Sequence, residues 1–243
     1  MMKNLAEIIL FWLVKIKHFI MSTNEENTTI FASYYDTNGK LQKVTMSEIS
    51  DLISDQDNKA VVADWVYHRL YDRFLKPFFF DDDSELKKHQ ELVELYQKQY
   101  KHGFAIMTNC CLLIETLAAF LNGDNETSKD KGSAVKAYTK VFKKAQGYNN
   151  CLKTFKDKPL YGAVRCGLLH QGETYNSFII RRSGNILHND GKTINASLFA
   201  KALKKFLESY RDELKSDECK WDSELWDNCR KKIRHIIANS SKK

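Results

Sequence analysis

A twenty-residue stretch, residues 104–123, constrains the fold of this chain more than any other segment. Its sequence is FAIMTNCCLLIETLAAFLNG, which is apolar on nearly every face of a helix. A helix of this kind has to be buried, so we expect it at the centre of a helical core. The whole chain has 243 residues and is 43% hydrophobic, with only 2 prolines and 10 glycines, which favours helices over a turn-rich β-sandwich.

The flanking patterns predict the other elements. Residues 30–55 indicate a small β-hairpin around TNG (37–39) and then a short helix. Residues 177–194, SFIIRRSGNILHNDGKTI, indicate a second β-hairpin that turns near 183–185. Apolar spacing and caps predict the remaining segments as helices: 58–76, 83 or 84 to 121 with a weak point at Gly103, 134–146, 159–172, 196–215 and 223–238.

These elements predict a mostly α fold. We expect an N-terminal α/β appendage over residues 21–80 and a helical domain over 81–243 that ends in a basic helix. Residues 1–20 form an apolar leader whose uninterrupted apolar run, 8–14, is too short to span a membrane. This leader is either an extended start before Met21, a docking helix or a surface anchor, and we favour the first two. We expect no stable membrane span.

The cysteines and the missing signatures exclude several classes of protein. The six cysteines include no C-x-x-C pair and no zinc-finger spacing, so we expect reduced thiols in the cytoplasm and no structural metal. No phosphate loop, G-x-G-x-x-G, G-x-S-x-G or H-E-x-x-H pattern occurs, so we expect no cofactor. The acidic run DDDSE at residues 81–85 is more typical of a helix cap than of a metal site.

The segment VRCGLLHQG, residues 164–172, places Arg165 and His170 in an otherwise apolar helix. The spacing alone means little, because it recurs in this chain for the pairs Arg181 and Arg182 with His188, and Arg230 with His235. The context separates the sites. The helix predicted over 159–172 has an apolar stripe at an i, i+4, i+8 spacing, which consists of Leu160, Val164 and Leu168. Its glycines, Gly162 and Gly167, permit the close approach of another backbone.

The segment AVRCGLLHQGET, preceded by the helix NCCLLIETLAAFLN, resembles the HEPN domain family over residues 85–215. Many members of this family are helical, metal-independent ribonucleases of phage-defence, toxin–antitoxin and CRISPR systems, with an R-x(4–6)-H signature that Arg165 and His170 match. The family residue after the arginine is commonly polar, whereas here it is Cys166. The resemblance implies RNA as a partner, a homodimer that forms through the motif helix, and an antitoxin or sensor protein that restrains it.

The chemistry of the two residue types fits RNA cleavage. Histidine can take a proton from the 2′-OH or protonate the leaving 5′-oxygen, and the guanidinium fork binds phosphate oxygens. A five-residue spacing puts Arg165 and His170 about 140° apart around a helix, so they do not share a face. Members of the family dimerise so that two motifs line one cleft, and the resemblance implies the same arrangement here. The alternatives are a non-catalytic binding module, or plain packing in which Arg165 pairs with Glu115 and His170 caps the helix end.

Two polar residues of the apolar helix, Glu115 and Asn109, are candidates to support this motif. Glu115 is an acid in the apolar helix, and we expect it either to orient Arg165 or His170 or to pair with another basic residue at the core edge. Asn109 is either a site residue or a helix-surface amide.

The net charge of +7 is concentrated in residues 131–158, which carry eight lysines and one aspartate. This stretch is either a solvated helix face or a surface that attracts phosphate. In the second interpretation the RNA contacts are Lys140, Lys143, Lys144 and Lys153.

Overall fold

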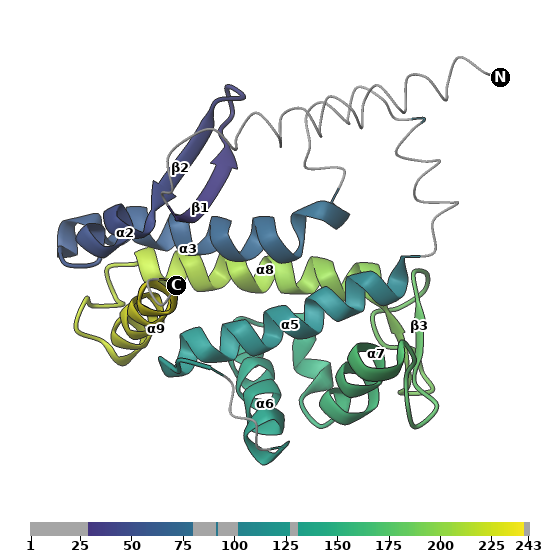
Figure 1. The fold of residues 1–243 in the computed structure, drawn as a ribbon. Coiled ribbons are helices and arrows are strands. Elements are labelled where there is room, and N and C mark those ends of the chain that lie inside the picture. Colours follow the sequence, from purple (N-terminus) through teal and green to yellow (C-terminus); the bar gives the residue numbers. More distant parts are fainter. Residues whose placement is uncertain (1–28, 80–90, 92–101, 127–130, 241–243) are drawn as a thin grey trace.

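The computed structural model describes residues 29–79, 91, 102–126 and 131–240, and it is mostly helical (Figure 1). Helix α5 (Gly103–Asn122) is the centre, as its composition predicts, with most of its apolar side chains buried. It packs against α6 (Lys131–Gly147), α8 (Ala196–Lys215) and α9 (Glu224–Ser240). The start predicted for this helix near residue 84 lies outside the described residues; α5 itself begins at Gly103.

The N-terminal hairpin and helix form as predicted. Strands β1 (Ile30–Tyr35) and β2 (Leu41–Thr45) are antiparallel, and Gly39 supplies a positive φ of 74° in the turn between them. A capping box between Thr45 and Glu48 starts α2 (Met46–Leu52). After a short 3-10 turn, η2 (Gln56–Asn58), α3 (Lys59–Phe74) packs along α8, and a second one, η3 (Lys76–Phe78), follows at Pro77. The buried residues of these elements belong to the same core as those of α5.

The β-hairpin predicted after the motif helix is wrong. Strands β3 (Ile179–Arg181) and β4 (Thr193–Asn195) pair in parallel, because the chain reverses twice between them, at Gly184 and at Gly191. Leu187 forms an antiparallel bridge with Ile194, so β4 has a neighbour on each side. The Asp190 side chain closes the second turn, accepting hydrogen bonds from the backbone and the hydroxyl of Thr193 at 2.8 and 2.6 Å.

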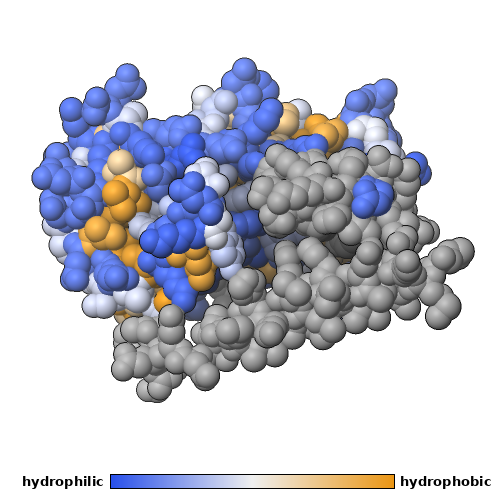
Figure 2. All heavy atoms as spheres, turned by 90° about the horizontal axis from the view of Figure 1, so that it is seen from above, coloured by the Kyte–Doolittle hydropathy of each residue, from blue (hydrophilic) through white to orange (hydrophobic). Residues whose placement is uncertain are grey.

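Among the described residues, α5 is the only helix long and apolar enough to cross a membrane, and 61% of its most apolar window is buried inside the protein. Its composition is that of a core helix. The apolar leader, residues 1–20, lies outside the described residues. Seen from above, the described surface is largely hydrophilic, with apolar side chains in small groups (Figure 2).

Candidate functional site

The motif segment has two kinds of helical turn. A π-helical stretch, η7 (Tyr161–Arg165), comes first and leads directly into the α-helix α7 (Cys166–Gln171). The Cys166 N–H donates to the Tyr161 carbonyl five residues earlier, which widens the turn at the arginine. Gly172 ends the helix in the left-handed region, with a φ of 69°, as predicted. Such π-helical turns occur frequently at functional sites.

Glu115 on α5 holds Arg165 with both of its carboxylate oxygens. The Arg165 Nε lies 2.6 Å from Glu115 Oε1, and Nη2 lies 3.3 Å from Oε2. The two side chains are 20% and 14% exposed, so the pair is partly shielded from water. The hydrogen bonds to Glu115 raise the pKa of Arg165 above its ordinary value, so the guanidinium stays charged. Glu115 therefore pairs with the arginine of the motif, as one of our two interpretations predicted.

Two tyrosines surround this arginine, and the sequence reasoning missed both. The guanidinium carbon of Arg165 lies 5.4 Å from the ring centroid of Tyr161, and that ring packs edge-on against Tyr138 on α6. The Tyr138 hydroxyl donates to the Cys111 carbonyl at 3.2 Å. Burial raises the pKa of the Cys111 thiol to about 12, so this neighbour is neutral. The available signal was the position of Tyr161, one helical turn before the arginine.

His170 lies apart from this group. It is exposed in the last turn of α7, and its side chain makes no hydrogen bond or ion pair within the described part of the chain. From Arg165 it is about 140° around the helix and about 7.5 Å along it. One chain therefore does not bring the two motif side chains together on one face.

The two glycines of the motif segment have different surroundings. A Cβ on Gly167 would lie 2.4 Å from the Glu173 carbonyl oxygen, so the close approach at this glycine comes from the chain's own residues 173–174. The expected close approach of another backbone at Gly167 is therefore made within the chain, and it leaves no room there for a partner helix. Gly162 has nothing within 4 Å of such a Cβ, so its surface is open.

Among the described residues, neither Asn109 nor any of the four lysines forms a hydrogen bond or ion pair with Arg165 or His170. The Asn109 side chain donates to the Ala105 carbonyl of its own helix at 2.9 Å. Tyr138 faces the motif segment from α6, and Lys140, two residues later, points about 200° away from it. In Figure 1, α7 and α9 lie on opposite sides of α6.

Three of the four lysines have partners elsewhere. Lys140 donates to the Leu121 carbonyl at 3.0 Å and to the Asn122 side chain, at the C-terminal end of α5. Lys144 pairs with Glu213 at 2.7 Å, and Lys153 donates to Asn149 at 2.8 Å. Lys143 is exposed.

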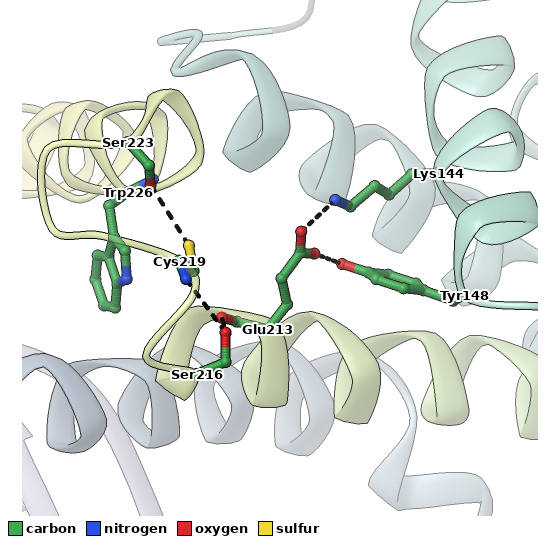
Figure 3. Close-up of polar contacts among 7 residues, drawn as sticks. All are labelled: Lys144, Tyr148, Glu213, Ser216, Cys219, Ser223 and Trp226. Carbon is green, nitrogen blue, oxygen red and sulfur yellow. Dashed lines mark hydrogen bonds and ion pairs between the residues drawn. The ribbon is translucent and has the colours of Figure 1, made fainter.

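A cavity of about 480 Å³ lies where α5, α6, α8 and α9 meet. Its wall is a polar network (Figure 3): Glu213 binds Lys144 and the Tyr148 hydroxyl, and Cys219 Sγ lies 3.4 Å from Ser223 Oγ. Burial, followed by the bond to Glu213, raises the pKa of Tyr148 far above its usual range. Since these polar groups satisfy one another, the wall holds the helix ends together.

The described residues contain no group of three His, Cys, Asp or Glu side chains placed to hold a metal ion. All six cysteines are free thiols. A scan against protein-family models found no match, and searches of curated proteins and of solved structures found none either.

Proposed function

We propose that this chain is a metal-independent endoribonuclease of the HEPN type that acts in the cytoplasm as a homodimer. The observation that carries the proposal is the arrangement of the motif: Glu115 fixes a charged, partly exposed Arg165 at a π-helical turn, and His170 is exposed in the following helix. A preorganised guanidinium is suited to the negative charge that develops on phosphorus. An exposed imidazole is suited to proton transfer near neutral pH.

The reaction follows from these groups. His170 takes the proton of a ribose 2′-OH, the 2′-oxygen bonds to the adjacent phosphorus, and the bond from phosphorus to the 5′-oxygen breaks. A second histidine protonates the departing 5′-oxygen, so the products are a 2′,3′-cyclic phosphate and a 5′-hydroxyl. Arg165 stabilises the pentacoordinate phosphorus with the guanidinium edge that Glu115 does not occupy.

The dimer is part of the proposal because one chain supplies one histidine and places it away from its own arginine. Two motif helices that meet along their exposed side would bring the second histidine and the second arginine. The exposed apolar side chain of Leu169, next to His170 in the sequence, the exposed Tyr175 and the open surface at Gly162 support this face as the contact.

Cleavage in the presence of a chelator tests the proposal. Wild-type protein with mixed RNA and EDTA should give products that end in 2′,3′-cyclic phosphate. Arg165→Ala and His170→Ala should be inactive, while His235→Ala should keep full activity, because Arg230 and His235 have the same five-residue spacing outside the motif. Full activity of Arg165→Ala or His170→Ala would sink the assignment.

Dilution of the wild type tests the shared site. If each active cleft uses groups from both chains, dilution below the dissociation range of the dimer lowers the specific activity. A wild-type specific activity that does not change on dilution below the dissociation range of the dimer would contradict a composite site.

A non-catalytic RNA-binding or protein-binding module is the second candidate. The observation in its favour is that Glu115 already occupies two of the three guanidinium nitrogens of Arg165, which leaves fewer donors for a phosphate. In that case an antitoxin or sensor protein is the partner to seek. RNA that binds without His170-dependent breakdown would support this candidate over the nuclease.

A further inference from the structure

A second hollow, of about 670 Å³, lies between the C-terminal end of α5 and the face of α6 that points away from the motif. We call it the α6 groove. Small side chains line its apolar part: Ala118, Ala119 and Ala137. The volume is in the range of sites that hold a drug-sized molecule or a short piece of polymer.

Three lysines line this groove at successive turns of α6. Lys136, Lys140 and Lys143 are four and three residues apart, so they lie on one face of the helix. Lys136 and Lys143 are exposed, and neither forms a hydrogen bond or ion pair within the described residues. Lys140 is fixed at the edge of the groove by its hydrogen bonds to the end of α5.

Two acids, Asp124 and Glu126, also line the groove. With the three lysines they leave one net positive charge, which favours an anion. Carboxylates repel phosphates but accept hydrogen bonds from hydroxyl groups. A ribose 2′-OH is such a donor and deoxyribose lacks it, so the mixture of lysines and acids favours RNA over DNA.

We infer that the α6 groove binds the backbone of single-stranded RNA. Its phosphates contact Lys136, Lys140 and Lys143, and its 2′-hydroxyls donate to Asp124 or Glu126. This inference rests on the proposed function only in taking RNA as the ligand. It places a binding surface on the side of α6 opposite to Tyr138 and the motif segment.

The test compares two double charge reversals of equal size. Both are made in the His170→Ala protein, so that the RNA is not cut. Lys136→Glu with Lys143→Glu alters the groove, and Lys201→Glu with Lys205→Glu alters two exposed lysines of α8 outside it. The probe is a fluorescent oligouridine RNA of about 12 nucleotides, a length typical of a single-strand site. Circular dichroism checks that both variants are folded.

We expect the groove variant to bind at least about tenfold more weakly at 0.1 M salt, while the control pair changes affinity less than about threefold. The slope of log K against log salt should fall by about 1.4 for the groove variant, since each phosphate contact to a single strand contributes about 0.7. Equal weakening by both pairs, or none by the groove pair, would overturn the groove as a site.

Two further probes decide the ligand class. Oligothymidine DNA of the same length should bind more weakly than the RNA, and equal binding would overturn the role of the 2′-hydroxyl. A polyglutamate competitor should displace the labelled RNA less well than unlabelled RNA of equal charge does. Equal displacement by the two competitors would show that the groove selects only for negative charge and would overturn RNA as its ligand. Because cleavage takes no part in these measurements, an inactive wild type would reject the nuclease proposal and leave the groove intact.

Discussion

Two ion pairs hold helices together, one between the motif segment and α5 and the other between α6 and α8. In one, Arg165 Nε lies 2.6 Å from Glu115, and in the other Lys144 Nζ lies 2.7 Å from Glu213. Each cation also lies over a tyrosine ring, at 5.4 Å for Arg165 on Tyr161 and 5.1 Å for Lys144 on Tyr148. By distance and composition the two pairs are almost the same.

Their geometry separates them. Glu115 gives both oxygens to one guanidinium, whereas Glu213 divides its oxygens between Lys144 and the Tyr148 hydroxyl. The second pair closes a network within regular helices, and the first sits on a π-helical turn before an exposed histidine. A shielded ion pair is therefore weak evidence of function by itself. The helical turn that carries the ion pair and the residues around the pair distinguish a candidate functional site from a pair that only joins helices.

The largest difference expected between the pairs is in cleavage. Arg165→Lys should lower the initial rate of RNA cleavage at least about 100-fold, because an ammonium cannot hold Glu115 with two nitrogens and still present a donor edge to phosphate. Lys144→Arg should leave the rate within about threefold. Rates are measured with EDTA and equal protein concentrations. Similar losses in both variants would remove the functional distinction between the pairs.

The packing of residues 173–174 on Gly167 is close enough that one added methyl group should lower the stability of the fold. Gly167→Ala should lower the free energy of unfolding by about 1–3 kcal/mol, because its Cβ would meet the Glu173 carbonyl at 2.4 Å. Gly162→Ala, with open space around it, should be neutral or stabilise the helix by up to about 1 kcal/mol. Urea unfolding measures both. A harmless Gly167→Ala would contradict the packing of residues 173–174 on the motif helix.

Removing the charge of each carboxylate shows how much each ion pair contributes to stability. Glu115→Gln should lower the free energy of unfolding by about 1–2 kcal/mol, since it leaves a partly shielded guanidinium without its counter-ion. Glu213→Gln should have the smaller effect, about 0.5–1 kcal/mol, because its pair is 29% and 33% exposed and more open to water. The same urea measurement at low salt checks the order, and the reverse order would make Glu213 the stronger clamp.

A further expected effect concerns alkaline pH. Burial and Glu213 raise the pKa of Tyr148, so the folded protein keeps this phenol neutral while the unfolded chain ionises it near pH 10. This contribution to stability is fully present below about pH 10 and is lost as the pH rises further. Tyr148→Phe should be less stable by about 1 kcal/mol at pH 7, and the difference from wild type should narrow by pH 11. A constant difference in urea midpoints would contradict the shift.

Local signals predicted the elements that local chemistry controls. The boundaries of α8, the glycine cap at Gly172 and the N-terminal hairpin follow from capping, turn and periodicity patterns, and the structure confirms them. The pairing of Glu115 with Arg165 could also be predicted from the sequence, because an acid in an apolar helix needs a partner.

Contacts between segments that are distant in the sequence could not be predicted from it. The parallel pairing of β3 with β4 depends on two successive reversals and on the Asp190 turn, although the residues read as a simple hairpin. The neighbour of Gly167 is a backbone segment that no spacing rule reveals. The lysine-rich stretch predicts either a solvated helix face or a surface that attracts phosphate, whereas the helix directs Lys144 to Glu213 and Lys136 to the α6 groove.

The π-helical turn also fixes how long the motif segment has to be. A turn closed from residue i to i+5 contains one residue more than an α-helical turn, so the path from Pro159 to Gly172 holds a residue that a regular helix would not need. Deleting Ala163 would let the segment close as an ordinary helix, and its two halves would then rotate against each other by about 100°. Either Arg165 would leave Glu115 or Gly167 would leave residues 173–174. A deletion of one residue before Arg165 would therefore break one of the two contacts that fix the motif segment, with the arginine and the histidine both unchanged.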